Sequence, residues 1–280
     1  MEQLISLLPD EHAKQIRIRE LRHVEEIRLR VGEPLLLRER EKEMWIRPSL
    51  SQEAVEDVLR RACRQSVYAC QETLRQGFVT VDGGHRIGIS GVGVLQNGVV
   101  QNLHHPSSLV LRIAREAIDC ADSLVGKISN STLLIGPPCS GKTTLLRDLV
   151  RLLSDRCGQR VSLVDERAEI SAALHGVPQL DIGMRTDVLI NIPKGEAVMM
   201  LLRTMNPQWI AVDEITAPAD ISALEQASYC GVKLLATAHA DSVEDLQRRP
   251  LYRMLMEKKI FQTVVLLKTD KSYITQEVAQ

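Results

Sequence analysis

The sequence is poor in aromatic residues, which make up 3% of its 280 positions, and it contains no C-x-x-C pair and no long apolar run. Proteins that bind single-stranded nucleic acid commonly stack bases on aromatic side chains, so the scarcity of aromatic residues argues against a function in single-strand binding. Without C-x-x-C spacing, the six cysteines give little support for a zinc or dithiol centre. No apolar stretch approaches the roughly 18–20 residues that a membrane-spanning helix needs.

The charge is also unbiased, with 35 basic and 36 acidic residues and a net charge of −1. This balance argues against a broad nucleic-acid-binding face and leaves room only for a local basic stripe. The N-terminal run MEQLISLLPDEHAKQ contains acidic residues and does not resemble a secretory signal. We expect a cytoplasmic protein with reduced thiols, which would reach a membrane only peripherally, through partners.

The residue pattern divides the chain into two halves. Residues 1–127 predict a small α+β domain, and residues 128–280 predict a second domain with a different rhythm. In the first half, EIRLRVGEPLLL from Glu26 alternates apolar and polar residues and then breaks at a turn, as paired strands do. FVTV-DGG-HRIGIS and GVGVLQ-NG-VVQNL each predict a hairpin, and Asn97–Gly98 is the stronger turn signal.

The first half of the sequence gives fewer signals for helices than for strands. Ser49 and Gln52 form a potential capping box before a run with helical spacing. The run LVLRIA from Leu109 predicts the start of a segment that becomes helical and ends near Leu124. The small, polar residues 126–131 predict a linker.

The second half alternates short apolar strands with helical patterns. The strands are TLLIG, RVSLVD, WIAVDE, VKLLATA and TVVLLK. This alternation predicts a parallel sheet with crossover helices. The expected helices are 142–156, 168–175, 196–205, 218–230 and 242–248. A loop at 177–195 exceeds the usual connection length, which suggests a function or an interface.

The strongest motif is GPPCSGKTT, which follows an apolar strand and opens a helix, and which matches G-x-x-x-x-G-K-[ST]. Glycines let successive backbone N–H groups face phosphates, and the helix N-terminus adds a partial positive charge. Lys142 is expected to reach the β- and γ-phosphates, and the Thr143 hydroxyl to ligate Mg²⁺. The predicted nucleotide-binding residues are Gly136, Pro137, Pro138, Cys139, Ser140, Gly141, Lys142, Thr143 and Thr144.

A second motif is WIAVDE, an apolar strand that ends in Asp213 and Glu214. Ligands bind at the carboxyl ends of parallel strands, so Asp213 would hold Mg²⁺ and Glu214 would orient the attacking water. VKLLATA is a candidate extra strand between this strand and the phosphate strand, with Thr237 and His239 at its end. These features predict an α/β P-loop ATPase fold of the RecA-like or AAA+ type, with a parallel sheet and a smaller N-terminal α+β domain.

A third charged strand end is VDERAE. The charged residues Asp165, Glu166, Arg167 and Glu169 come at the end of the strand after the phosphate-loop helix, so they would border the nucleotide. The alternative is a solvated loop, which is the commoner setting for a cluster of charges.

With these motifs in order, residues 130–270 resemble the ring-forming ATPases of type II and type IV secretion and pilus retraction. VDERAE resembles their acidic box, LRTMNPQWIAVDE their L-R-x-x-P-D segment, and TAHADS their histidine box. The resemblance implies a role for His239 in coupling hydrolysis to the rest of the subunit. The class often has Gly-His before the histidine-box strand, but here Val232 follows Gly231, so that histidine is missing.

Over its whole length the chain resembles a stage III sporulation family of endospore formers, through EIRLRVGEP, GHRIGISG, DIGMRTDVL and the motifs above. This resemblance implies an ATPase that uses Mg-ATP to power assembly of, or transport through, a membrane channel complex. It also implies a homo-oligomeric, hexameric ring and membrane channel proteins as partners.

Ring ATPases place arginines against the γ-phosphate of a neighbouring subunit. The candidates are Arg203, which we expect to be catalytic, and Arg112, which resembles a nucleotide-contacting arginine near the interdomain hinge. Arg185 and Arg86 are weaker, and for each the alternative is a surface ion pair. Two other functions remain open: a nucleic-acid-dependent motor on the same fold, and a scaffold that binds ATP without useful turnover.

Overall fold

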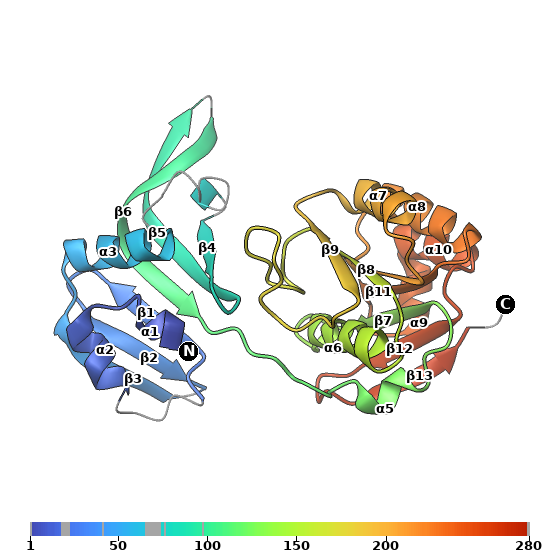
Figure 1. The fold of residues 1–280 in the computed structure, drawn as a ribbon, viewed down its shortest axis with the longest axis horizontal. Coiled ribbons are helices and arrows are strands. Elements are labelled where there is room, and N and C mark those ends of the chain that lie inside the picture. Colours follow the sequence, from blue (N-terminus) through green and yellow to red (C-terminus); the bar gives the residue numbers. More distant parts are fainter. Residues whose placement is uncertain are drawn as a thin grey trace. The chain divides into compact units, whose positions relative to one another are not determined.

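The computed structural model describes residues 2–17, 23–40, 42–64, 74–75, 77–96 and 98–278. The chain divides into two compact units, residues 1–115 and 116–280 (Figure 1). This division precedes the boundary expected after residue 127. The intervening segment packs on the second unit, where Ala121 and Leu124 are fully buried. Asp148 also fixes it, by accepting hydrogen bonds from the backbone amides of Asp119 and Ala121 at 3.2 and 2.8 Å.

The first unit contains an antiparallel sheet with the strand order β3-β2-β1-β6-β5-β4. Alternate residues such as Ile27 and Leu29 on β1 are buried in a core that the helices also line. The expected hairpins are confirmed by the pairing of β1 with β2, β4 with β5 and β5 with β6. Asn97 lies outside the described residues. The elements are α1 (Glu2–Ile5), α2 (Asp10–Arg17), β1 (Glu26–Arg30), β2 (Pro34–Glu39), β3 (Lys42–Ser49), α3 (Gln52–Ala62), β4 (Phe78–Val81), β5 (His85–Gln96) and β6 (Val99–Arg112).

Two expectations for this unit are wrong. The N-cap of α3 is Ser51, whose hydroxyl accepts a hydrogen bond from the Ala54 amide at 3.1 Å, whereas Ser49 ends β3 and pairs with Pro34. The run from Leu109 continues β6, and Leu111 pairs with both β1 and β5. The alternation of buried and exposed side chains there is that of a strand, so the expected helix shrinks to α5 (Asp122–Val125) in the second unit.

The second unit contains a sheet with the order β13-β12-β7-β11-β10-β8-β9, parallel except for β13. The predicted extra strand is confirmed, because β11 lies between the phosphate strand β7 and the acidic strand β10. The elements after α5 are β7 (Thr132–Gly136), α6 (Lys142–Asp155), β8 (Val161–Asp165), β9 (Thr186–Ile190), α7 (Lys194–Thr204), β10 (Trp209–Glu214), α8 (Pro218–Tyr229), β11 (Lys233–His239), α9 (Val243–Arg248), α10 (Pro250–Glu257), β12 (Thr263–Leu267) and β13 (Tyr273–Glu277).

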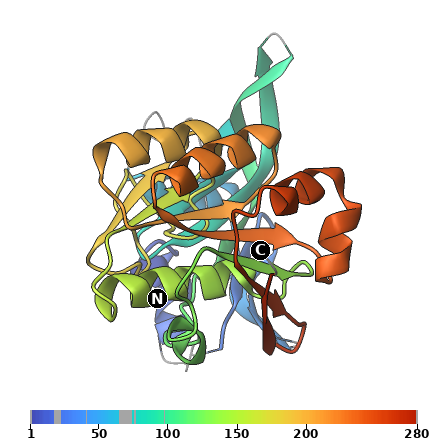
Figure 2. The same cartoon turned by 90° about the vertical axis from the view of Figure 1, so that its right-hand side faces the viewer.

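Both faces of this sheet are covered, with α6 on one face and α7 and α8 on the other (Figures 1 and 2). The strand β7 shows why, because all five of its residues are buried. Leu133 and Ile135 pack in the cluster with α7 and α8, while Leu134 packs in the cluster with α6. A strand buried on both faces needs a continuous apolar run, which is what the sequence has.

The expected helix at 168–175 is wrong, since this segment is an irregular loop. The backbone at Ala168, Ala172 and His175 has positive φ, which a right-handed helix excludes. The predicted loop 177–195 contains the edge strand β9, and α10 and β13 were not expected. Among the described residues, no helix has both the length and the apolar character needed to cross a membrane.

Candidate nucleotide site

The phosphate loop joins β7 to α6 and needs glycine at both ends. A side chain at Gly136 would place its Cβ 2.6 Å from the carbonyl oxygen of Leu267, so only glycine fits. Gly141 caps α6 in the left-handed region, at φ +97°. Its Cβ position lies 3.3 Å from the Lys271 ammonium. The loop therefore curls tightly against the end of β12 before the helix begins.

Lys142, the first residue of α6, is buried and folds back over this loop. Its ammonium donates to the carbonyls of Gly136 and Pro137, both at 2.8 Å, and contacts Nδ1 of His239 at 3.0 Å. Burial lowers the pKa of Lys142, while the nearby Glu214 and Asp213 carboxylates oppose that shift. An anionic ligand would supply the negative charge that this desolvated cation lacks.

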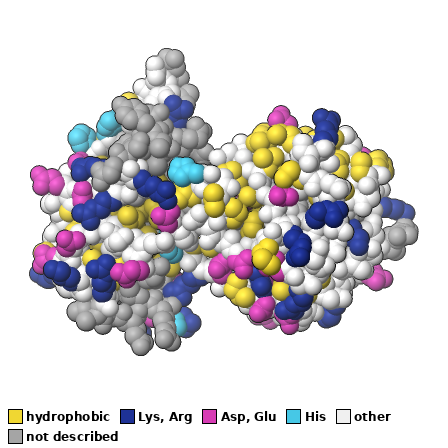
Figure 3. Space-filling model, in the orientation of Figure 1, with side chains coloured by type: hydrophobic (Ala, Val, Ile, Leu, Met, Phe, Trp, Pro, Cys, Tyr) yellow, Lys and Arg dark blue, Asp and Glu magenta, His cyan; other side chains and the backbone are white. Residues whose placement is uncertain are grey.

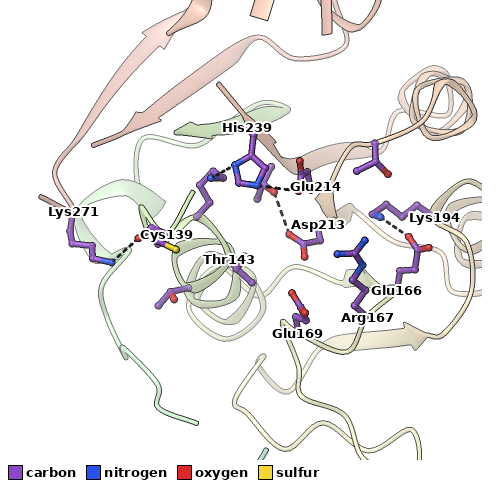
Figure 4. Close-up of a pocket in the computed structure, with 15 residues that line it drawn as sticks. Cys139, Thr143, Glu166, Arg167, Glu169, Lys194, Asp213, Glu214, His239 and Lys271 are labelled. Carbon is purple, nitrogen blue, oxygen red and sulfur yellow. Dashed lines mark hydrogen bonds and ion pairs between the residues drawn. The ribbon is translucent and has the colours of Figure 1, made fainter. Parts of the chain in front are cut away.

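His239 links Lys142 to Glu214. Its Nε2 lies 3.2 Å from a carboxylate oxygen of Glu214 (Figure 4), while its other ring nitrogen, Nδ1, contacts Lys142. An ammonium can only donate, so Nδ1 must accept, and Nε2–H then donates to Glu214. One neutral tautomer satisfies both contacts. The end of β11 thus connects the phosphate-loop lysine to the acidic strand.

Asp213 lies beside Glu214 at the end of β10. Burial raises the pKa of Asp213, and the negative charge of Asp165 adds to the shift. The Thr237 hydroxyl donates a hydrogen bond to the Asp213 carboxylate at 3.3 Å. Asp213 is only half-buried and its side-chain hydrogen bond is long, so its carboxylate retains lone pairs for a cation.

Asp165 does not line the pocket, in contrast to its expected place beside the nucleotide. One of its oxygens accepts from the amides of Glu169 and Ile170, at 2.9 and 3.1 Å. The other accepts from the amide and hydroxyl of Ser171, at 2.8 and 2.6 Å. The carboxylate is 1% exposed, so it is a structural anchor for the loop after β8.

That loop presents Glu166, Arg167 and Glu169 to a pocket of about 480 Å³ at the carboxyl edge of the sheet (Figure 4). Several predicted residues meet there: Cys139, Gly141, Lys142, Thr143, Thr144, Glu166, Asp213, Glu214 and His239. Of the remaining predicted loop residues, Gly136 and Pro137 turn their carbonyls to Lys142. Pro138 is exposed, and Ser140 is buried behind the loop with no hydrogen-bond partner for its hydroxyl.

The pocket fits a phosphate chain accompanied by Mg²⁺. Thr143 and Asp213 offer a hydroxyl and a carboxylate oxygen, the hard ligands that Mg²⁺ prefers. Within the described ranges, no group of three or more His, Cys, Asp or Glu side chains could hold a metal ion alone. Mg²⁺ commonly takes only one or two protein ligands and completes its shell with phosphates and water, so this sparse set suits it.

The predicted arginines lie elsewhere. Arg203, at the end of α7, lines a hollow at the amino edge of the sheet with Gln208 and Lys233. Because α7 starts at the pocket, its last turn must lie at the opposite edge. Arg203 also precedes Pro207 by one residue more than L-R-x-x-P requires. Arg112 ends β6 in the first unit.

Three pocket residues were not expected: Lys194, Thr216 and Lys271. Thr216 lies two residues after the predicted Glu214, so proximity was an available signal. Lys194 precedes the predicted helix at 196–205, and Lys271 lies in the turn between β12 and β13. The Lys271 ammonium donates to the Cys139 carbonyl at 3.5 Å. Nothing in their local sequence indicates a ligand.

Comparison with solved structures agrees with this geometry and gives the fold class: the chain has a P-loop ATPase fold, which it shares with a pilus retraction motor and with the ATPase DotB. The pilus retraction motor PilT with bound ADP aligns with 92% of this chain and 80% of its own, at a TM-score of 0.64 and 17% identity. The ATPase DotB of Yersinia pseudotuberculosis aligns with 96% of this chain and 79% of its own, at a TM-score of 0.62 and 16% identity. At these identities the likeness shows the fold alone.

The sequence gives the particular family. The family model for Sporulation stage III, protein AA matches residues 3–276, and the chain belongs to this family. The stage III sporulation protein AA of Bacillus subtilis (strain 168) is 39% identical over 256 residues, which cover 89% of this chain and 83% of that protein. The resemblance inferred from the motifs is therefore confirmed.

Proposed function

We propose that the second unit binds Mg-ATP and hydrolyses it to ADP and phosphate. The observation that supports this most directly is the chain of contacts from Lys142 through His239 to Glu214, which joins the phosphate loop to the acidic strand. Because Lys142 and Glu214 both contact the His239 imidazole, a phosphate group that draws Lys142 away would also change the surroundings of Glu214. Fold alone would not indicate hydrolysis.

Each residue has a role that its position supports. Lys142 exchanges its loop carbonyls for the β- and γ-phosphates, and Thr143 and Asp213 hold Mg²⁺, which neutralises phosphate charge when bound. Glu214 orients and polarises the attacking water. His239 transmits the state of Glu214 to Lys142. Glu166 borders the nucleotide from the β8 loop.

The substitution Glu214→Gln tests hydrolysis. It keeps the size and the oxygen that contacts His239 but removes the base, so phosphate release should fall about 10²–10⁴-fold while Mg-ATP still binds. Glu225→Gln is the matched control, because Glu225 on α8 pairs with Lys258 at the end of α10 and does not line the pocket. Equal, near-zero rates in the wild type and Glu214→Gln would favour the scaffold that binds without turnover.

The nucleic-acid motor is the second alternative. In Figure 3, basic and acidic side chains are interspersed on the visible face of each unit, which agrees with the even composition. We therefore expect no stimulation of phosphate release by DNA. A large stimulation would favour the motor that acts on nucleic acid.

We further propose that the chain assembles as a hexameric ring and powers a sporulation channel complex, as its resemblance to secretion and pilus motors implies. In a ring, Arg203 and Arg112 would act on the nucleotide of a neighbouring subunit, which fits the absence of Arg203 from its own pocket. Location at a membrane would come through channel partners. Light scattering with and without Mg-ATP tests assembly, and a strict monomer at micromolar concentration in both would contradict it.

A further inference from the structure

Lys194 is the first residue of α7 and is 7% exposed. Its ammonium forms an ion pair with Glu166 at 2.5 Å on the wall of the nucleotide pocket. A helix N-terminus carries partial positive charge, so a lysine there is unfavourable for the helix. Burying the ammonium adds a desolvation cost. A residue that violates two stability rules at the edge of a pocket is expected to serve the ligand.

The backbone around Lys194 is fixed. Gly195 packs so closely on α8 that an added Cβ would lie 3.2 Å from the carbonyl oxygen of Ala219. The first turn of α8 is held in turn by Asp220, which accepts hydrogen bonds from the Thr216 and Ala217 amides, both at 3.0 Å. Since Thr216 follows Glu214 by two residues, Lys194 is tied to the end of β10. Only its side chain is free to change partner.

The backbone that carries the partner residue, Glu166, is held in place as well. Glu166 follows Asp165, whose hydrogen bonds anchor the loop after β8. Its side chain is 38% exposed, so it contacts water as well as the lysine. In Figure 4 the pair lies across Asp213 and Glu214 from the phosphate-loop residue Cys139. Since Asp213 and Glu214 are the residues proposed above to hold Mg²⁺ and the attacking water, the terminal phosphate of a nucleotide would lie at this end of the pocket.

We propose, on the basis of the function proposed above, that Lys194 reads the terminal phosphate and so distinguishes ATP from ADP. A γ-phosphate competes with Glu166 for the ammonium and offers more charge and more acceptor oxygens. ADP has no such group, and with ADP bound the lysine keeps its ion pair with Glu166. The exchange occurs at the start of α7, so it reports the state of the nucleotide to that helix.

Calorimetric titration of the full chain with Mg-ADP and with the non-hydrolysable analogue Mg-AMP-PNP tests this specificity. Lys194→Gln should weaken the affinity for AMP-PNP about tenfold or more, as loss of a charged hydrogen bond does, and should change the affinity for ADP by no more than about twofold. Glu166→Gln removes the competitor and should raise the preference for AMP-PNP over ADP. Lys194→Arg should restore part of the preference.

Lys258→Gln is the control, because it breaks an ion pair of similar length, 2.6 Å, outside the pocket. If Lys194→Gln does not fold, the ratio of affinities in Glu166→Gln decides the question. If Lys194 is purely structural, Lys194→Gln weakens the binding of both nucleotides equally. Such an equal loss, or an unchanged ratio of affinities in Glu166→Gln, overturns this inference but not the proposed function. Wild-type protein that binds neither nucleotide overturns the proposed function as well.

Discussion

Two aspartates, Asp165 and Asp213, end neighbouring parallel strands of one sheet and yet differ in every contact. Asp165 accepts four hydrogen bonds from the loop that follows it. Asp213 accepts one from a side chain, at 3.3 Å, and faces the pocket. The carboxyl end of a parallel strand therefore does not by itself make a carboxylate functional. The role depends on whether the chain beyond it folds back to use the oxygens.

The largest expected effect separates the two residues by stability. Asp165→Ala leaves several buried amides without acceptors and should lower the free energy of unfolding of the second unit by about 3–5 kcal/mol. Asp213→Ala should change it by no more than about 1 kcal/mol, because little is bonded to that carboxylate.

Urea unfolding in a Trp45→Phe background measures this difference. The chain has two tryptophans, and Trp209 is buried in β10, so its fluorescence then reports on the second unit alone. Equal losses from the two substitutions would show that both carboxylates are structural and would remove the contrast.

A somewhat smaller effect concerns the ligand. Mg-ATP at about 100 times its dissociation constant should stabilise the wild type by about 2.7 kcal/mol. Part of this stabilisation depends on Mg²⁺ and is abolished by EDTA. Asp213→Asn should lose most of that Mg²⁺-dependent part, because the amide is a poorer ligand for Mg²⁺. Thermal unfolding with Mg-ATP, with ATP plus EDTA and without nucleotide separates the contributions. Full Mg²⁺ dependence in Asp213→Asn would exclude Asp213 as a ligand.

The smallest effect is a pH dependence without Mg²⁺. Because burial raises the pKa of Asp213 above its ordinary 3.8, the folded protein holds this proton to a higher pH than the unfolded chain. The contribution of Asp213 to stability is therefore present below pH 3.8 and falls as pH rises through its folded-state pKa. Asn does not titrate.

Asp213→Asn should therefore match the wild type near pH 3.8 and exceed its stability at neutral pH. Urea unfolding in EDTA from pH 3.5 to 7.5 would follow the difference. A gap that widens toward acid would mean that the pKa is lowered, and that Asp213 already has a favourable partner.

The same contrast shows how far the sequence could predict the site. The phosphate loop was predictable, because Gly136, Gly141 and Lys142 stand at fixed spacing between a strand and a helix. Asp165 and Asp213 could not be told apart, since both end apolar strands. Their difference depends on the backbone at 166–171, which wraps one carboxylate and overlaps the segment 168–175 that was predicted as a helix.

Long-range contacts between side chains were also beyond the sequence, although the sheet was not. The parallel sheet followed from the alternation of strands and helices, and the place of β11 between β7 and β10 followed from the Asp213–Glu214 pair at the end of the acidic strand. The ion pair of Lys194 with Glu166 joins residues 28 apart in the chain and leaves no periodic signal. The place of Arg203 at the far edge depends on the direction of α7, which its motif does not encode.

Calorimetric titration of the wild type and Lys142→Ala with Mg-ATP tests the central claim, that this pocket holds a nucleoside triphosphate. We expect saturable binding to the wild type and a loss of affinity of at least about tenfold in Lys142→Ala. No heat of binding in folded wild-type protein, or equal affinity in both, would contradict the account.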